Sequence, residues 1–146
     1  MSVTFSHVGL CVSDLDRSLR FYCDGLGFEL VGSHGVGDEF GPLMELDGVR
    51  LESRFLRRDG VSIELLCFTA PGHTGAATRR PMNQLGLTHL SIRVDDVDAA
   101  VASLEALGGT VVGATRTTLG AGDARLEFVY CCDPDGVRIE LMKLPA

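Results

Sequence analysis

Two histidines and two glutamates recur at matched places in the chain, and together they are suitable ligands for one divalent metal ion. They are His7, Glu64, His89 and Glu140. Two neutral imidazoles and two carboxylates bring a doubly charged cation to neutrality, and this mixed set suits Zn, Ni, Co, Mn or Fe. A buried carboxylate is costly without a compensating charge, which such an ion supplies. The residue types therefore predict one divalent metal ion as cofactor.

An internal repeat distinguishes these residues from unrelated polar positions. The segment HVGLCVSDLDRSLRFYCDGLG, which begins at His7, aligns with HLSIRVDDVDAAVASLEALGG, which begins at His89, at an offset of 82 residues. DGVSIEL and DGVRIEL, which contain Glu64 and Glu140, align at an offset of 76 residues. A single His or Glu is usually a surface residue. The same polar types at the same places of two copies predict a shared role.

Each copy is predicted to begin with a strand that bears its histidine. After His7 and His89, apolar residues alternate with other types, as in HVGLCV and HLSIRV. This period of two is typical of a strand with one buried face. The two histidines lie on the opposite face.

A helix is predicted to follow this strand in each copy. The candidate N-terminal caps are Ser13, Asp14, Asp95 and Asp96. Their side-chain oxygens can accept hydrogen bonds from the first helical turn. Apolar residues then recur at helical spacing until a glycine, so we expect the helices to end near Leu26 and Leu107.

Several strand-like segments follow each helix. They are FELVG, PLMELDG, VRLESRFL and VSIELLCF in copy one, and TVVGATR, RLEFVYC and VRIELMK in copy two. A DG pair precedes the last strand of each copy and predicts an antiparallel hairpin. In these last strands the period of two separates Glu64 and Glu140 from the core-facing residues. All four candidate ligands are therefore expected on the concave side of a curved sheet.

The repeat predicts a single α+β domain over residues 1–146, built from two βαβββ modules. Module one covers residues 1–69, a linker covers 70–86, and module two covers 87–146. The linker is rich in Gly, Pro, Thr and Ala and has no clear periodicity. It is long for a connection in a compact domain, so it is expected to cross the surface or to carry function.

The composition narrows the possible partners. A net charge of −7 argues against a nucleic-acid partner, because that binding depends on clustered Lys and Arg. No apolar run approaches the roughly 20 residues of a membrane helix, and the first residues do not resemble a signal peptide. Five cysteines, an odd number, fit reduced thiols better than a disulfide framework. We expect a cytoplasmic protein that acts on a small molecule, with no nucleic-acid or membrane partner.

The chain resembles the vicinal oxygen chelate superfamily over nearly its whole length. The motifs that carry the resemblance are H-x-x-x-x-V at both starts, DLDRSLRFYCDGLGFEL after the first, and DPDGVRIEL near the end. Members include glyoxalase I, methylmalonyl-CoA epimerase, extradiol dioxygenases and the fosfomycin and bleomycin resistance proteins. The resemblance implies a cupped eight-stranded mixed sheet around a metal bound by His7, Glu64, His89 and Glu140.

The resemblance also implies a reaction. The ligand set is similar to that of glyoxalase I, whereas the segment GLTHLSIRVDDVDAAVASL looks more like an epimerase. Both enzymes move a proton next to a carbonyl group, with Glu64 or Glu140 as the expected base. Glyoxalase I enzymes usually carry an arginine four residues after the first histidine to hold glutathione, where this chain has Cys11. Arg93, at the equivalent place of copy two, is expected to bind an anionic part of the substrate.

Two other functions stay open. One is an Fe(II) extradiol-type dioxygenase with His7, His89 and Glu140 as its facial triad; Glu64 counts against it, because that chemistry needs open metal positions. The other is a metal-free protein that sequesters an antibiotic, against which the four intact ligands count. For the isomerase or lyase, a thioester or hemithioacetal is the expected substrate. We expect a homodimer, whose site closes either within one chain or between two.

Four further polar residues have weaker predictions. Glu45 and Glu52 lie in the predicted middle strands of copy one and are alternative bases. If the turn that follows sets an odd register, Glu52 shares the face of Glu64. His34 and His73 lie in glycine-rich segments and are expected in loops.

Overall fold

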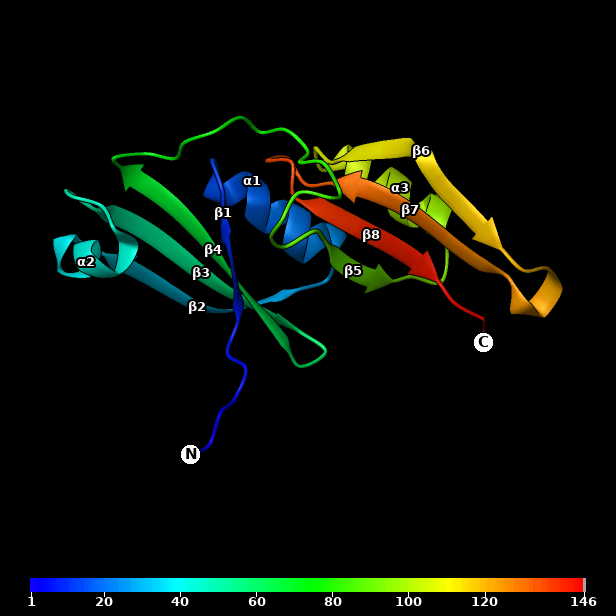
Figure 1. The fold of residues 1–146 in the computed structure, drawn as a ribbon, viewed down its shortest axis with the longest axis horizontal. Coiled ribbons are helices and arrows are strands. Elements are labelled where there is room, and N and C mark those ends of the chain that lie inside the picture. Colours follow the sequence, from blue (N-terminus) through cyan, green and yellow to red (C-terminus); the bar gives the residue numbers. More distant parts are fainter. Residues whose placement is uncertain (146) are drawn as a thin grey trace. The chain divides into compact units, whose positions relative to one another are not determined.

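The computed structural model describes residues 1–145, which form two compact units divided after Gly75 (Figure 1). Each unit contains a four-stranded mixed sheet and a helix that follows its first strand. The predicted α+β class and the paired βαβββ modules are confirmed. No helix of the described residues is long and apolar enough to cross a membrane.

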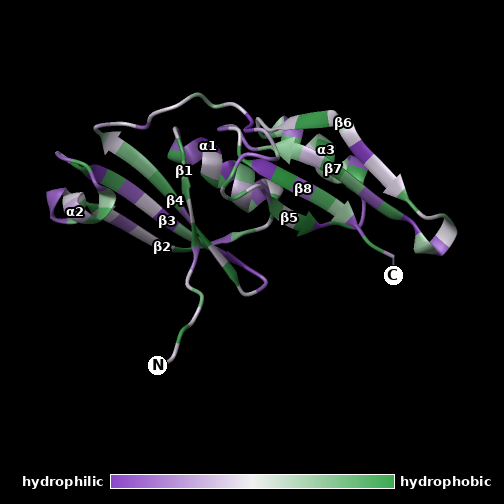
Figure 2. Ribbon diagram, in the orientation of Figure 1, coloured by the Kyte–Doolittle hydropathy of each residue, from purple (hydrophilic) through white to green (hydrophobic). Residues whose placement is uncertain are grey.

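Unit 1 has the strand order β1-β4-β3-β2, in which β1 and β4 are parallel and the other neighbours are antiparallel. Its elements are β1 (Val8–Cys11), α1 (Leu15–Leu19), the π-helix η1 (Arg20–Gly25), β2 (Glu29–Val36), η2 (Asp38–Phe40), α2 (Gly41–Met44), β3 (Arg50–Arg58) and β4 (Val61–Ala70). In Figure 2 β3 contains both apolar and polar residues, and from Arg50 to Ser53 its residues are alternately exposed and buried.

The first helix of unit 1 begins and ends as its sequence predicts. The carboxylate of Asp14 accepts a hydrogen bond of 2.9 Å from the amide of Arg17, which caps α1. The helix continues as η1 to its C-terminal cap at Leu26. Phe21 and Tyr22 are fully buried in the core of this unit, together with Ile63 of β4. This packing leaves the other face of the sheet for Glu64.

Unit 2 repeats the plan with the strand order β5-β8-β7-β6, and here β5 and β8 are the parallel pair. Its elements are β5 (Leu90–Arg93), α3 (Val97–Ala106), β6 (Thr110–Leu119), η3 (Gly122–Ala124), β7 (Leu126–Cys132) and β8 (Arg138–Lys143). Asp96 caps α3 by accepting a 3.0 Å hydrogen bond from the amide of Ala99, and Leu107 is the C-terminal cap. Leu104 of α3 is buried, as are Ile139 and Leu141 of β8.

Both predicted hairpin turns are present. Between β3 and β4, Asp59 and Gly60 have φ of 49° and 78°, the pair of positive values that a tight hairpin turn needs. Before β8, the carboxylate of Asp133 accepts hydrogen bonds from the amides of Asp135 (2.9 Å) and Val137 (2.8 Å). Gly136 in this second turn has a φ of 89°.

The segment PLMELDG of copy one is helical, so the predicted strand there was wrong. Pro42 lies in the first turn of α2, where its missing amide hydrogen costs nothing, whereas a strand would lose a ladder hydrogen bond. Glu45 follows the helix in the left-handed conformation, with a φ of 56°. Glu45 is therefore not a strand residue.

Candidate metal centre

In unit 1, His7 and Glu64 form a close pair at the strand boundary that the repeat predicts. His7 directly precedes β1, and Glu64 lies opposite Gly9 in the parallel β1–β4 pairing. The Nε2 atom of His7 is 3.1 Å from Oε2 of Glu64, and the side chains are 32% and 16% exposed. The pair is thus partly shielded from water yet open on one side.

Unit 2 contains the equivalent pair. His89 directly precedes β5, and Glu140 lies opposite Ser91 in the parallel β5–β8 pairing. The distance between Nε2 of His89 and Oε2 of Glu140 is 3.7 Å, with side chains that are 26% and 19% exposed. Each unit therefore brings one predicted histidine and one predicted glutamate together.

The other ring nitrogen of each histidine, Nδ1, lies within hydrogen-bond distance of a hydroxyl group. The Ser6 hydroxyl is 2.9 Å from Nδ1 of His7, and the Thr88 hydroxyl is 2.9 Å from Nδ1 of His89. A neutral imidazole with its proton on Nδ1 donates to such a hydroxyl and keeps the lone pair of Nε2 toward the glutamate. This arrangement suits metal binding through Nε2.

The glutamates are held by serines that come from different strands in the two units. Ser53 of β3, which is 2% exposed, donates a 2.5 Å hydrogen bond to Oε1 of Glu64. Ser91 of β5 donates a 2.7 Å hydrogen bond to Oε2 of Glu140. Sequence reasoning missed both residues. Ser91 lies two residues after His89 on the same strand face and was therefore detectable, whereas Ser53 depends on the register of the β3–β4 hairpin.

An aromatic ring lies beside each pair at the same place in the sheet. Phe55 is opposite Glu64 in the β3–β4 pairing, and Tyr130 is opposite Glu140 in the β7–β8 pairing. The ring centroids of His7 and Phe55 are 5.1 Å apart, and those of His89 and Tyr130 are 5.4 Å apart, both edge to face. These contacts restrict the rotation of the histidines.

The distances within each pair fit two ligands of one metal ion. Ligand atoms about 2.1 Å from an ion, at angles between octahedral and tetrahedral, are roughly 3.0–3.4 Å apart. The separations of 3.1 Å and 3.7 Å lie near this range. Within residues 1–145 no three or more His, Cys, Asp or Glu side chains are grouped closely enough to hold a metal ion. Each pair thus brings two candidate ligands together, and the complete set of four stays a prediction.

The strand register also places two other residues of the repeat. Cys11 pairs with Leu66 and Arg93 pairs with Met142, two positions along from the glutamates of the same strands. Each is therefore on the ligand face of its sheet, meaning the face that bears Glu64 in unit 1 or Glu140 in unit 2. Both side chains are exposed.

Two predictions about polar residues of copy one come out differently. Glu52 pairs with Cys67, and its position in β3 is an odd number of residues from Phe55, so it lies on the face opposite to Glu64. His34 is not in a loop but in β2, where its ring packs edge to face on Phe55 at 5.6 Å. The face of Glu52 follows from the register of the β3–β4 hairpin, and the position of His34 follows from the pairing of β2 with β3. The sequence left both pairings open.

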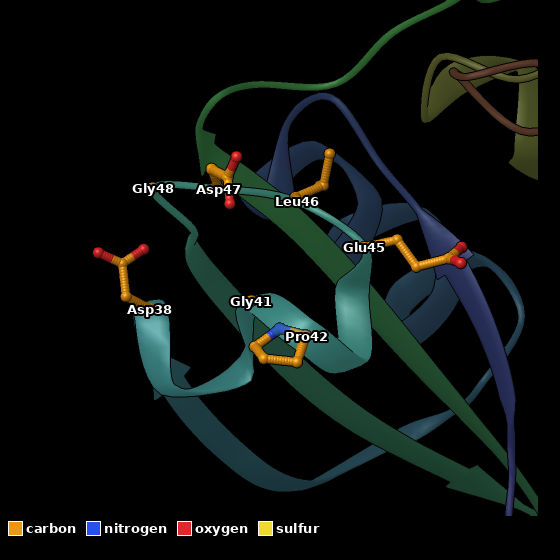
Figure 3. Close-up of a pocket in the computed structure, with 7 residues that line it drawn as sticks. All are labelled: Asp38, Gly41, Pro42, Glu45, Leu46, Asp47 and Gly48. Carbon is orange, nitrogen blue, oxygen red and sulfur yellow. The ribbon is translucent and has the colours of Figure 1, made fainter.

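Glu45 lies at a separate pocket beside α2. The pocket is lined by Asp38, Gly41, Pro42, Glu45, Leu46, Asp47 and Gly48. In Figure 3 the side chains of Asp38 and Glu45 point away from each other, so the carboxylates do not converge on one point. Because the described residues contain no group of three or more such side chains, Glu45 does not join His7 and Glu64 in one cluster.

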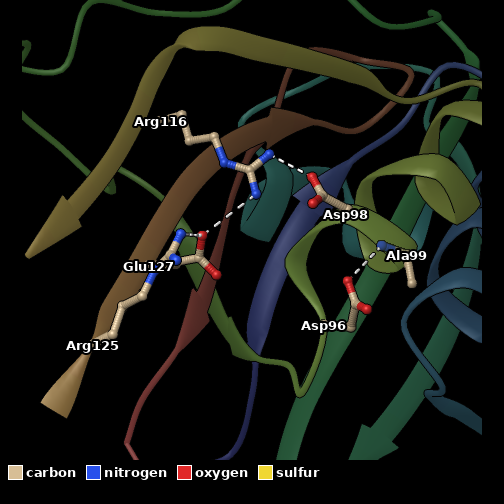
Figure 4. A network of polar contacts seen from close by, with 6 residues as sticks. All are labelled: Asp96, Asp98, Ala99, Arg116, Arg125 and Glu127. Atoms are coloured by element: carbon tan, nitrogen blue, oxygen red, sulfur yellow. Dashed lines mark hydrogen bonds and ion pairs between the residues drawn. The ribbon is translucent and has the colours of Figure 1, made fainter. Parts of the chain in front are cut away.

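A charged network in unit 2 has a structural role. Arg116 of β6 contacts Asp98 of α3 at 2.5 Å and Glu127 of β7 at 3.6 Å, and Arg125 also contacts Glu127 (Figure 4). The hydrogen bond from Arg116 and its charge lower the pKa of Asp98 below its usual value. Tyr130 is opposite Glu140, and Glu127 is an odd number of residues from Tyr130 on the same strand. Glu127 therefore lies on the face of the sheet opposite to Glu140.

No disulfide bond joins the cysteines in the described part of the chain. Burial, followed by the proximity of Cys132 and Glu105, raises the pKa of Cys131 to about 11. Burial also raises the pKa of Cys132. Both thiols are therefore protonated near neutral pH and are poor nucleophiles.

Comparisons with known proteins agree with this fold. A family model described as the Glyoxalase/Bleomycin resistance protein/Dioxygenase superfamily matches residues 4–141. A 2-epi-5-epi-valiolone epimerase from an Actinomyces species is 31% identical, over 99% of this chain and 81% of that protein. A probable lactoylglutathione lyase from Vibrio cholerae is 32% identical, over 94% of this chain and 88% of that protein. The crystal structure of a glyoxalase family protein from Bacillus cereus matches with a TM-score of 0.83 at 23% identity, over 100% of this chain and 97% of that one.

Proposed function

Because the chain belongs to the Glyoxalase/Bleomycin resistance protein/Dioxygenase superfamily, we propose that it is a divalent-metal-dependent isomerase or lyase that moves a proton next to a carbonyl group. The observation that carries the proposal is the duplicated pair, His7 with Glu64 and His89 with Glu140. Relatives named as an epimerase and as a lyase, each about a third identical to this chain, support the same class of reaction.

The four residues of the two pairs would hold the ion. A divalent cation at such a site stabilises the negative charge that develops on a carbonyl oxygen when the adjacent carbon loses a proton. The Nδ1 partners Ser6 and Thr88 orient the imidazoles for this role, while Ser53 and Ser91 orient the carboxylates. The same four-residue set disfavours a dioxygenase, because Glu64 would occupy a position that oxygen chemistry needs open.

A carboxylate of the same site would move the proton. Glu64 or Glu140 accepts the proton from the substrate carbon at an Oε atom, and the electron pair of the C–H bond passes to the carbonyl carbon–oxygen unit. Return of the proton to the opposite face of the same carbon gives epimerisation, whereas its return to the neighbouring carbon gives a glyoxalase-type product.

Two residues on the ligand faces indicate which kind of substrate the site would bind. Cys11 takes the place where glyoxalase I enzymes carry a glutathione-binding arginine, and it offers no positive charge to a glutathione carboxylate. Arg93 is exposed on the ligand face of unit 2 and is suited to an anionic substituent. We therefore favour epimerisation of a small carbonyl compound with an anionic group over a glutathione-dependent lyase.

Metal analysis and deuterium exchange test the proposal together. Purified protein is reconstituted with Zn, Ni, Co, Mn or Fe(II) and incubated in D2O with glutathione hemithioacetals, acyl-CoA thioesters and hydroxylated cyclic ketones. We expect one tightly bound ion and metal-dependent deuterium incorporation next to the carbonyl of one class. The E64Q and E140Q variants should lose exchange by about 10²-fold or more. Failure of the wild-type chain to bind any of the ions, or full exchange by both variants, would overturn the proposal.

A further inference from the structure

Arg138 is a largely buried cation on the ligand face of unit 2. It is 8% exposed, and it precedes Glu140 by two residues in β8. Because alternate residues of a strand point to the same side, Arg138 and Glu140 share one face of the sheet. The side chain of Arg138 therefore leaves the sheet on the same side as a candidate metal ligand.

The ring of Tyr130 lies between Arg138 and the second His–Glu pair. Tyr130 is opposite Glu140 in the β7–β8 pairing, and its ring packs edge to face on His89 at a centroid distance of 5.4 Å. The guanidinium carbon of Arg138 lies 5.4 Å from the centre of the same ring. The guanidinium group is thus separated from a candidate metal ligand by one aromatic side chain.

The contacts of Arg138 leave its charge without a counter-ion. Nη2 donates a 2.7 Å hydrogen bond to the carbonyl oxygen of Arg80, and the ring of Tyr130 is also a neutral group. None of the ion pairs within residues 1–145 involves Arg138. A buried charge is costly unless an opposite charge compensates it. An anionic ligand would supply that charge.

Two nitrogen atoms of Arg138 can bind such a ligand. Nε and Nη1 make no hydrogen bond in the described part of the chain. Neither belongs to the wholly buried side-chain atoms of residues 1–145 that lack a hydrogen-bond partner. Both nitrogen atoms therefore contact solvent, although most of the side chain is buried. Their N–H groups can donate charge-assisted hydrogen bonds to the oxygens of a carboxylate or a phosphate.

The positive charge at this place is specific to unit 2. The internal repeat puts Ser62 in unit 1 at the position of Arg138, so the shared strand plan does not require an arginine there. A second cation adds to the charge. Burial raises the pKa of Cys132, which is opposite Arg138, and the charges of Arg138 and Arg79 act against that rise. Two arginines thus act on the same end of β7 and β8.

We propose that Arg138 is a specificity-determining residue that binds an anionic group of the carbonyl substrate, a carboxylate or a phosphate. The inference rests on the proposed function and deepens it, because it gives the substrate a charge at a defined place. Arg138 and Glu140 are two residues apart, or about 7 Å along a strand, so the anionic group would lie a few bonds from the carbonyl. Arg93 is opposite Met142, in the other direction from Glu140, and would contact a different part of the substrate.

Three hydroxamates with the same metal-binding group test the inference. The Zn2+-loaded protein is titrated by calorimetry with butyrohydroxamate, with succinic acid monohydroxamate, in which a carboxylate replaces the terminal methyl group, and with the corresponding phosphonate. We expect the wild type to bind at least one anionic probe about 10–100-fold more tightly than butyrohydroxamate, as is typical of a hydrogen bond to a charged group. The probe with the larger preference distinguishes a carboxylate substrate from a phosphate substrate.

Three variants assign this preference to Arg138. R138Q should lose it, and the ratio of two affinities within one variant cancels a general change in the metal site. R138K keeps the charge but not the planar guanidinium, so it should have a smaller preference than the wild type, and it replaces R138Q if that variant does not fold. R125Q is the matched control, because Arg125 is exposed and contacts Glu127 on the opposite face of the sheet. R125Q should keep the wild-type preference.

The outcomes separate this inference from the proposed function. Equal affinities of the wild type for charged and uncharged probes would overturn the inference and leave the proposed function intact. An undiminished preference in R138Q, or in R138K if R138Q does not fold, would do the same. A wild-type chain that binds no Zn2+ and none of the other ions would instead overturn both.

Discussion

Ser53 and Glu64 are joined across the β3–β4 hairpin by a 2.5 Å hydrogen bond from a nearly buried hydroxyl to a carboxylate oxygen. The bond orients Glu64, whose other oxygen lies 3.1 Å from Nε2 of His7. The sheet of unit 1 thus sets the direction of a candidate metal ligand through a residue that is not itself a ligand. This relationship and three others lead to measurable consequences.

The variant S53A is expected to weaken metal binding. Loss of the hydroxyl frees the Glu64 carboxylate to rotate, and loss of such a partner typically reduces metal affinity about 10–100-fold. Isothermal titration with Zn2+ measures the change. Ser18 is the matched control, because its hydroxyl is fully buried and has no hydrogen-bond partner within residues 1–145. Equal Zn2+ affinities for S53A and S18A would contradict the role of Ser53.

Removal of the metal is expected to lower the thermal stability of the protein. An ion that binds only the folded state at 100 times its Kd stabilises that state by about 2.7 kcal/mol, which for a chain of this size raises Tm by roughly 5–10 °C. Calorimetry with and without a chelator measures this shift. The H7Q variant should lose most of it, whereas H73Q, which alters an exposed histidine that follows β4 in unit 1, should keep it. A shift that survives in H7Q would argue against His7 as a ligand.

The buried thiols are expected to resist alkylation. Because burial raises the pKa of Cys131 to about 11, the thiolate is nearly absent at pH 8 in the folded protein. Iodoacetamide at pH 8 should modify the exposed Cys11 and leave Cys131 unmodified, as read by peptide mass spectrometry. Raising the pH toward 11 increases the reactive fraction of Cys131, and unfolding in guanidinium should expose it at pH 8. Rapid modification of Cys131 in the native protein at pH 8 would contradict this assignment.

The variant G136A is expected to lower the free energy of unfolding of unit 2 for two reasons, a positive φ and a steric clash. Gly136 has a φ of 89°, and a Cβ there would lie 2.7 Å from the carbonyl carbon of Thr78. The left-handed conformation costs about 1–2 kcal/mol, and the clash adds roughly 1–3 kcal/mol. Gly48 is the control, because it has a φ of 66° and nothing within 4 Å of an added Cβ. Urea unfolding should therefore place G136A well below G48A, and equal midpoints would exclude the contact with Thr78.

Much of the fold follows from local sequence patterns. Asp14 and Asp96 cap their helices because a short acidic side chain before an apolar run satisfies the first amides without tertiary help. Alternation along the last strands places Glu64 and Glu140 opposite to the core residues of the same strands. The prediction failed at PLMELDG, where Pro42 favoured a short helix over the strand suggested by the apolar residues.

By itself, the sequence determined that one His and one Glu recur in register, because a repeated module folds by the same local rules in both copies. Only the tertiary structure decided which residues surround them. Ser53, Phe55 and Tyr130 reach the glutamates across antiparallel pairings, and a shift of one residue in either hairpin would turn them to the opposite face. Turn geometry and packing set that register, so the hydrogen bond from Ser53 to Glu64 is evident only in the folded sheet.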